Sequence, residues 1–327
     1  MSRIFLSIVV AWLVGGCASK QPARLAEPPP VPPRVETTLE PRLVERAAAE
    51  VAAAAQADDP LRRANAAEAA QHLPRGEAES LLLERLGDDD ARVRFAAAMA
   101  VGRERFDSPA IRESLEQLVA GESPNARIAG LFALHRLGDT SRSQAMAEAT
   151  LSSDPVLRAN AAVALGLTDE PSAVDVLAPL LTDRDGNVAL NAAEALWHLG
   201  DERGLEPLVI ATVNQHADDN VIGTLGLSAR SDPRVRQALR GKLTDDYVEV
   251  RLAAARALGR VGSDAGYGVA MAAIDKGNPL QRGLAARAFG DIGRRDAKAM
   301  LAPLLAADDA NLRLAAATAL LQLADAS

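Results

Sequence analysis

One pattern of apolar and polar positions recurs along the chain from Pro41 onward, as in the stretch DPVLRANAAVALG at 154–166. Counted from the arginine of this stretch, the third and fourth following positions are nearly always Ala or Gly, and the seventh is usually Leu. Spacings of three, four and seven place these positions on one face of an α-helix. The pattern recurs nine times with steps of 31 residues and one step of 33, which predicts one structural unit stacked on itself. The arginine positions are Arg63, Arg94, Arg127, Arg158, Ala189, Asn220, Arg251, Arg282 and Arg313.

The beginning of each copy indicates a helix start. Four positions before the arginine position, seven of the nine copies carry a residue that caps helices well, because its side-chain oxygen accepts from unpaired backbone N–H groups. These residues are Asp59, Asp90, Ser123, Asp154, Asp185, Asn278 and Asp309. Proline follows in four copies, at the first helical position, where its missing N–H is not needed. The glycines near the other end are expected to stop these helices. They are Gly102, Gly166, Gly259 and Gly290.

A second amphipathic helix lies between successive copies, for example at 171–183 and 296–308. Two helices in each 31-residue unit predict an all-α fold, an α-solenoid of about nine two-helix repeats over residues 41–327. The composition agrees, since only 3% of the chain is aromatic and small residues allow helices to approach closely. An LxxLL-like helix followed by D-x-x-V-R-x-x-A-A-x-A-L-G resembles the HEAT repeats of the type first described in phycobilisome lyases. The resemblance covers Pro41 to about Ala324.

The resemblance implies a structural ladder of aspartates and arginines. Each Asp would cap its own helix, and each Arg would reach an aspartate or carbonyl groups of a neighbouring repeat; the alternative is a row of ionic ligand sites. The ladder residues are Asp59, Arg63, Asp90, Arg94, Arg127, Asp154, Arg158, Asp185, Arg251, Arg282, Asp309 and Arg313. The ladder is interrupted at Ala189 and Asn220, and the sixth copy also carries Gly223 and Gly226, which weaken a helix. This copy is a candidate hinge, or a copy that has simply decayed.

The N-terminal region has the features of export and anchoring. Residues 1–16, with Arg3 before an apolar run at 4–14, are typical of a signal peptide. LVGGCAS around Cys17 resembles the bacterial lipobox, which implies lipidation of Cys17 and an outer-membrane lipoprotein facing the periplasm; the alternative is an ordinary signal peptide. Residues 17–40 form a lipidated and Pro-rich linker, a spacer with a reach of roughly 70 Å.

Catalytic motifs are absent from the sequence. The chain has one cysteine and four histidines, and neither HExxH, GxSxG, a P-loop nor GxGxxG occurs. We therefore expect no catalytic residues, no cofactor and no metal. The formal net charge of −8 disfavours nucleic acid as a partner.

The positions that vary between repeats indicate where a partner would bind. In HEAT solenoids the second helix of each repeat lines the concave face, and a stripe of this helix changes along the chain. The candidate partner-binding residues are Arg92, Met99, Phe132, Val163, Glu194, Arg256 and Arg287. Among them, Met99, Phe132 and Val163 would form an apolar patch, unless they fill the grooves between repeats.

The leading hypothesis is a lipid-anchored scaffold, without enzymatic activity, that binds a protein or peptide along its concave face. Two alternatives stay open at this point: a bilin-lyase-like enzyme or chaperone of a chromophore protein, and a structural component of an outer-membrane assembly. The sequence leaves open the partner, the biological process and the oligomeric state.

Overall fold

The computed structural model describes residues 30–214 and 216–325. All secondary structure within these ranges is helical, which confirms the predicted all-α fold. The chain divides into two compact units. One comprises Ala52–Leu205, and the other combines Glu206–Ser327 with the N-terminal segment up to Val51. Cys17 and the predicted signal peptide lie outside the described residues.

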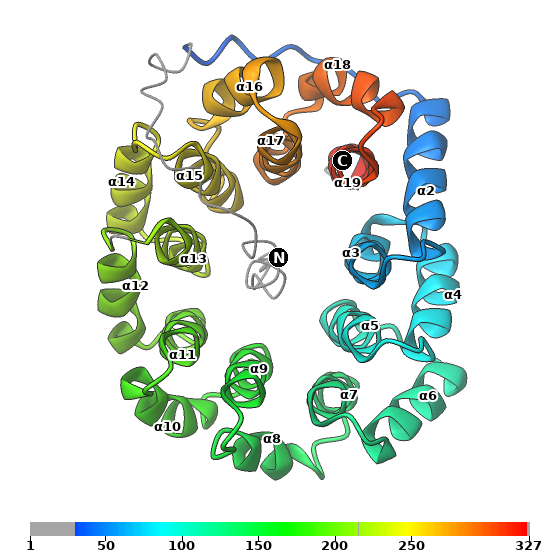
Figure 1. The fold of residues 1–327 in the computed structure, drawn as a ribbon, viewed down its shortest axis with the longest axis vertical. Coiled ribbons are helices and arrows are strands. Elements are labelled where there is room, and N and C mark those ends of the chain that lie inside the picture. Colours follow the sequence, from blue (N-terminus) through cyan, green and yellow to red (C-terminus); the bar gives the residue numbers. More distant parts are fainter. Residues whose placement is uncertain (1–29, 215, 326–327) are drawn as a thin grey trace. The chain divides into compact units, whose positions relative to one another are not determined.

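The unit Ala52–Leu205 is built from two rows of helices (Figure 1). The helices that carry the repeated pattern lie side by side in one row, and the intervening helices form the other row. The first row contains α3 (Pro60–Ala69), α5 (Ala91–Glu104), α7 (Pro124–Arg136), α9 (Pro155–Gly166) and α11 (Gly186–His198). The second row contains α4 (Arg75–Leu86), α6 (Pro109–Ala120), α8 (Ser143–Ala149) and α10 (Ala173–Leu177).

The other unit continues the same alternation and adds the N-terminal helix α2 (Pro41–Ala55), of which it includes the part up to Val51. Its pattern-bearing helices are α13 (Ala217–Leu227), α15 (Val248–Arg260), α17 (Pro279–Ile292) and α19 (Ala310–Asp325). Its intervening helices are α12 (Leu205–Ala211), α14 (Pro233–Lys242), α16 (Tyr267–Lys276) and α18 (Lys298–Leu301).

Two of the intervening helices are shorter than the sequence predicts. The predicted helix at 171–183 becomes α10 followed by the 3₁₀ helix Ala178–Thr182, and the one at 296–308 becomes α18 between two 3₁₀ helices, Arg295–Ala297 and Ala302–Ala306. Each of the segments Ala178–Thr182 and Ala302–Ala306 has a proline at its second residue. Proline lacks the N–H of an α-helical hydrogen bond and its ring crowds the preceding turn, so the chain tightens there.

The glycines expected to stop the pattern-bearing helices have a different role. Gly102 lies inside α5, where a Cβ would come within 2.6 Å of Cε1 of Phe132 in α7. Gly166 is the last residue of α9, and a Cβ there would lie 2.4 Å from Cβ of Ala195 in α11. Glycine at these positions lets the next helix of the row pack directly against the backbone. The prediction that they end the helices is wrong for Gly102, Gly259 and Gly290, which are followed by further helical residues.

None of the described helices is both long enough and apolar enough to cross a membrane.

Candidate functional site

The predicted caps are present. Asp59 accepts a hydrogen bond from the backbone N–H of Leu61 at 3.0 Å, and so begins α3. Four further aspartates of the ladder accept from the first turn of their own helices in the same way, and these are Asp90, Asp154, Asp185 and Asp309. These side chains therefore act locally, as the sequence indicates.

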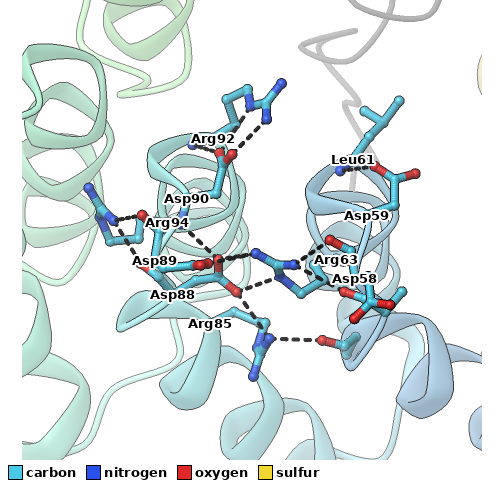
Figure 2. Close-up of polar contacts among 12 residues, drawn as sticks. Asp58, Asp59, Leu61, Arg63, Arg85, Asp88, Asp89, Asp90, Arg92 and Arg94 are labelled. Carbon is cyan, nitrogen blue, oxygen red and sulfur yellow. Dashed lines mark hydrogen bonds and ion pairs between the residues drawn. The ribbon is translucent and has the colours of Figure 1, made fainter.

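The ladder arginines are anchored by a common pair of bonds. Nη1 of Arg63 donates to the carbonyl oxygens five and six residues earlier, those of Asp58 at 3.1 Å and Ala57 at 3.0 Å (Figure 2). The same two bonds recur at Arg94, Arg158 and Arg313. With Nη1 held in this way, the edge formed by Nε and Nη2 is left to face the next element.

In two repeats the Nε and Nη2 edge of the arginine donates to a carboxylate of the following repeat. Arg63 binds Asp88 through Nε and Nη2, each at 2.8 Å, and Arg158 binds Asp183 with the same distances. These paired hydrogen bonds are the strong, geometrically specific form of the arginine–carboxylate contact. The hydrogen bonds from Arg158 lower the pKa of Asp183.

The acid in the ladder is therefore not the capping aspartate. Asp88 and Asp183 stand two residues before the caps Asp90 and Asp185, and neither belongs to the predicted ladder. The signal was present as a second acidic residue at a fixed offset, but the capping role of its neighbour hid it.

Other positions depart from the ladder. Among the described residues, the Arg127 side chain donates only to the carbonyl of Gly121, at 2.7 Å, and that of Arg251 only to the carbonyl of Asp245. The buried Nε of Arg282 has no hydrogen-bond partner among the described residues, so the ladder predicted there does not form. At the predicted gap, the Asn220 side chain donates to the carbonyl of Asn214, six residues earlier, at 2.7 Å. It therefore makes one of the two carbonyl bonds that an arginine makes at this position.

Gly223 in the sixth copy has a packing role. A Cβ on it would lie 2.7 Å from Cβ of Ala211 and 2.8 Å from the carbonyl oxygen of Leu208, so glycine is required for α12 and α13 to pack together. Gly223 is therefore explained by packing and need not reflect decay of the repeat. The hinge stays a prediction.

The predicted apolar patch is not a surface. Met99 and Phe132 are 0% exposed and Val163 is 3% exposed. Adjacent helices of the row pack side by side, and the ring of Phe132 lies against Gly102 of α5. The expectation of an exposed patch is therefore wrong, and these side chains fill the grooves between repeats.

The remaining residues of the predicted partner stripe do not form a single site. Glu194 is buried at 4% exposure, and exposed Arg92 bonds its own cap, Asp90. Arg256 donates to Asp291 at 2.9 Å, and Arg287 is half-buried. Arg256 and Arg287 also belong to a different unit from the others.

Two of the four histidines contact residues of a neighbouring segment. Nδ1 of His135 lies 2.7 Å from the hydroxyl of Ser143, and Nε2 of His198 lies 3.3 Å from Oδ1 of Asp169. Within residues 30–214 and 216–325, no group of three or more His, Cys, Asp or Glu residues could hold a metal ion.

The last repeats hold the N-terminal segment, within one unit. Arg294 donates from Nη1 to the carbonyl oxygen of Pro32 at 2.9 Å and from Nη2 to that of Pro33 at 3.0 Å. The backbone N–H of Val35 donates to Oδ2 of Asp296 at 3.1 Å. In Figure 1 this segment runs alongside α16 and α18, which belong to the row of intervening helices.

The residues that grip this segment are themselves fixed. Arg294 is 1% exposed, its guanidinium lies 4.1 Å from the centre of the Tyr267 ring, and its Nε donates to Asp296 at 3.1 Å. Burial raises the pKa of Asp296, but hydrogen bonds from Arg294 and from the N–H of Val35 lower the pKa by more than burial raises it. The net shift is downward, so the carboxylate is the favoured form. We call Arg294, Asp296, Tyr267 and Lys298 the clasp.

Further contacts extend this docking up to the start of α2 and into α2 itself. Nζ of Lys298 donates to the carbonyl of Thr38 and, at 2.7 Å, to Oε1 of Glu40, and this bond lowers the pKa of Glu40. Nε of Arg313, the last ladder arginine, donates to Oε1 of Glu50 at 2.9 Å. Helix α2 thus supplies a carboxylate to Arg313, as the following repeat does to Arg63 and Arg158. The Pro-rich linker was expected to be a free spacer, but its described part, residues 30–40, is bound by the last repeats.

Comparisons with known proteins agree with this architecture. The family model for HEAT repeats matches residues 47–135, 79–166 and 143–221, which together span more than half of the chain. No curated protein sequence matches the chain.

Solved structures resemble it at low identity. Human deoxyhypusine hydroxylase in complex with glycerol is 18% identical, with 76% of this chain and 96% of that chain covered and a TM-score of 0.38. The complex of CpcE and CpcF of phycocyanin lyase from Nostoc is 18% identical, with 72% and 91% covered and a TM-score of 0.40. Kap121p is 12% identical, with 88% and 38% covered and a TM-score of 0.38. On the family match, the chain belongs to the HEAT-repeat family.

Proposed function

We propose that this protein is a scaffold without enzymatic activity that binds a protein partner by holding an extended peptide at the clasp, a site that its own residues 32–40 occupy. One observation carries the proposal: buried Arg294 donates to two consecutive main-chain carbonyl groups, at Pro32 and Pro33. The contact is made to the backbone, and every peptide has that backbone.

The chemistry of the bound segment supports this function. Proline-rich chains favour the extended polyproline conformation, in which carbonyl groups make no internal hydrogen bonds and are available to a partner. Arg294 is held by Asp296 and by the Tyr267 ring, so little side-chain freedom is lost when a peptide binds. A preorganised pair of donors of this kind suits an extended segment with prolines and no regular secondary structure.

The tethered segment sets the affinity that a partner needs. A short tether gives an effective concentration in the millimolar range, so a free peptide competes only where it binds better or where the tethered segment is weakened. We propose that a partner offers a similar extended stretch and displaces residues 32–40.

The proposal includes a lipid anchor at Cys17 in the bacterial cell envelope, at the outer membrane and facing the periplasm. Support comes from the resemblance of LVGGCAS to a lipobox. Mass spectrometry of the mature protein should find diacylglycerol on Cys17, and Cys17→Ser should leave the membrane fraction. A Cys17→Ser chain that still fractionates with membranes would contradict the anchor.

Peptide binding at the clasp is tested with a labelled peptide of residues 30–41. The acceptor is the mature chain with Val35→Pro, which removes the N–H that reaches Asp296, and Glu40→Gln, which removes the charge facing Lys298. Fluorescence anisotropy should show saturable binding to this variant and at least tenfold weaker binding to wild type.

The matched control is the same acceptor with Arg294→Lys added. Lysine keeps the charge but lacks the two separate N–H donors that reach the carbonyl groups, so binding should be at least tenfold weaker. An acceptor that binds the peptide equally well with Lys at this position would refute the proposed function. Circular dichroism of each variant shows whether the helices are intact.

A further inference from the structure

A second candidate site lies in the other unit, at the ladder arginine Arg94. Among the described residues, four arginines share the two Nη1 bonds to loop carbonyls, and three of them hold a carboxylate on the opposite edge. Arg94 makes the same two anchor bonds, to the carbonyl oxygens of Asp88 at 2.7 Å and Asp89 at 3.0 Å. Within residues 30–214 and 216–325, no acceptor takes a hydrogen bond from its Nε or Nη2.

The missing acid has a sequence cause. The carboxylate that each arginine binds stands two positions before the cap of the following repeat. This position is Asp88 after Arg63, Asp183 after Arg158 and Gly121 after Arg94. The step from Arg94 to Arg127 is also the only one of 33 residues. A glycine therefore stands where the repeats that follow Arg63 and Arg158 present a carboxylate.

The space left there is a cavity of about 330 Å³ between the end of α4 and the segment from α6 to the start of α7. Arg94 and Gly121 line it, together with Ser114 and Gln117 of α6, whose side chains make no hydrogen bond to other described residues. Asp88 also borders the cavity, but its carboxylate is already bonded by Arg63 and by Arg85. Figure 2 shows Arg94 on the other side of the Asp88–Asp89 turn from Arg63.

We infer that Arg94 is a receptor for a carboxylate supplied from outside the ladder, with Ser114 and Gln117 as additional hydrogen-bond donors. The ligand class follows from the internal comparison, because the same anchored guanidinium edge binds Asp88 and Asp183 with two bonds of 2.8 Å each. An aspartate or glutamate side chain of a bound protein and a free small carboxylic acid share this chemistry. The site is independent of the clasp, which lies in the other unit.

One side chain of the protein competes for the position. Glu122 is exposed, borders the cavity and follows Gly121 directly, so its carboxylate is the intramolecular alternative. Variants at both residues separate the two cases.

The test uses the mature full chain labelled with ¹⁵N at arginine Nε, and Arg94→Lys assigns the Arg94 resonance by its loss. The probes are the peptide amide acetyl-Ser-Glu-Asp-Gly, its uncharged counterpart acetyl-Ser-Gln-Asn-Gly, and succinate. We expect a saturable shift of the Arg94 Nε–H resonance with the acidic peptide or with succinate, and none with the uncharged peptide. The tighter of the two acidic probes identifies the source of the carboxylate.

Gly121→Asp should fill the site from within the chain. The backbone φ of Gly121 is −69°, which aspartate adopts readily, although a Cβ would sit 3.2 Å from the carbonyl of Leu118 and requires a small adjustment. This variant should shift the Arg94 resonance in the absence of ligand, raise Tm and abolish binding of both acidic probes. Arg92→Lys changes an exposed arginine of the same helix that does not line the cavity, so it is the control and should leave binding unchanged.

Three results would overturn the inference. The first is no saturable shift in wild type with either acidic probe. The second is binding that persists in Gly121→Asp. The third is binding that appears only after Glu122→Gln, which would show that Glu122 completes the ladder and that the cavity receives no external ligand.

Discussion

Truncating Phe132 tests whether the row of pattern-bearing helices is a packed core rather than a binding face. The side chain is 0% exposed and its ring lies where a Cβ on Gly102 would have to be, with Cε1 at 2.6 Å and Cδ1 at 2.9 Å from that point. Phe132→Ala removes this ring and leaves a cavity between α5 and α7. The expected loss is about 3–5 kcal/mol in the free energy of unfolding of the unit Ala52–Leu205.

The contact also predicts coupling between the two positions. In wild type, Gly102→Ala forces its methyl group against the ring and costs about 1–3 kcal/mol, reduced by alanine's better helix propensity of about 1 kcal/mol. Without the ring, two of the three close contacts disappear and only Cα of Ala133, at 2.9 Å, remains. The double variant should therefore be more stable than the sum of the single effects by about 1 kcal/mol or more.

Urea unfolding measures all four corners of this cycle. Circular dichroism follows the helices, and fluorescence follows Trp197, which is buried in the same unit, so coincident transitions test two-state behaviour. Arg92→Ala, at an exposed position, is the control and should change the free energy by less than about 0.5 kcal/mol. A loss below about 1 kcal/mol for Phe132→Ala, or additive effects in the cycle, would refute the assignment of this residue to the core.

Three further predictions concern one helix cap and the contacts that hold the N-terminal segment and α2. Asp185→Ala should lower the free energy of unfolding by about 1 kcal/mol, because the Asp185 side chain accepts from the N–H groups of Asn187 and Val188, and Asp185→Asn should restore most of it. Asp296 has a pKa below its usual 3.8, so its contribution to docking is present above about pH 4 and is lost as the pH falls through the lowered value. The amide resonance of Val35 should titrate with a midpoint below 3.8, and a midpoint at or above that value would be inconsistent with the contact. Glu50→Gln should increase hydrogen exchange in α2, since the charge facing Arg313 is lost, whereas unchanged exchange would show that this ion pair does not hold the helix.

The sequence was sufficient for the helices and their starts because both depend on local rules. Asp59 and Asp154 cap the helices whose apolar spacing follows them, and a side chain that bonds a backbone group two residues away needs no knowledge of the rest of the fold. Periodicity also predicted the repeat, because a stacked unit buries the same face in each copy.

The candidate site depended on contacts between distant residues and could not be predicted in the same way. Spacing shows that Met99 and Phe132 lie on one stripe, but not that the neighbouring helix covers that stripe. A proline-rich segment predicts an extended chain, yet nothing in residues 32–35 indicates that Arg294, about 260 positions later, binds its carbonyl groups. Asp88 stands two residues before the capping Asp90 in the sequence, and only the contact with Arg63 shows which of the two carboxylates joins the repeats.

Docking of the N-terminal segment on the last repeats is most directly tested by zero-length crosslinking of the wild-type chain. Nζ of Lys298 lies 2.7 Å from Oε1 of Glu40, so a carbodiimide should join them as an amide. Mass spectrometry should find the peptide pair containing these residues, with a yield independent of protein concentration and lost in Glu40→Gln. A wild-type chain that gives no such pair, or gives it only between two molecules, would contradict the clasp and the peptide-binding function built on it.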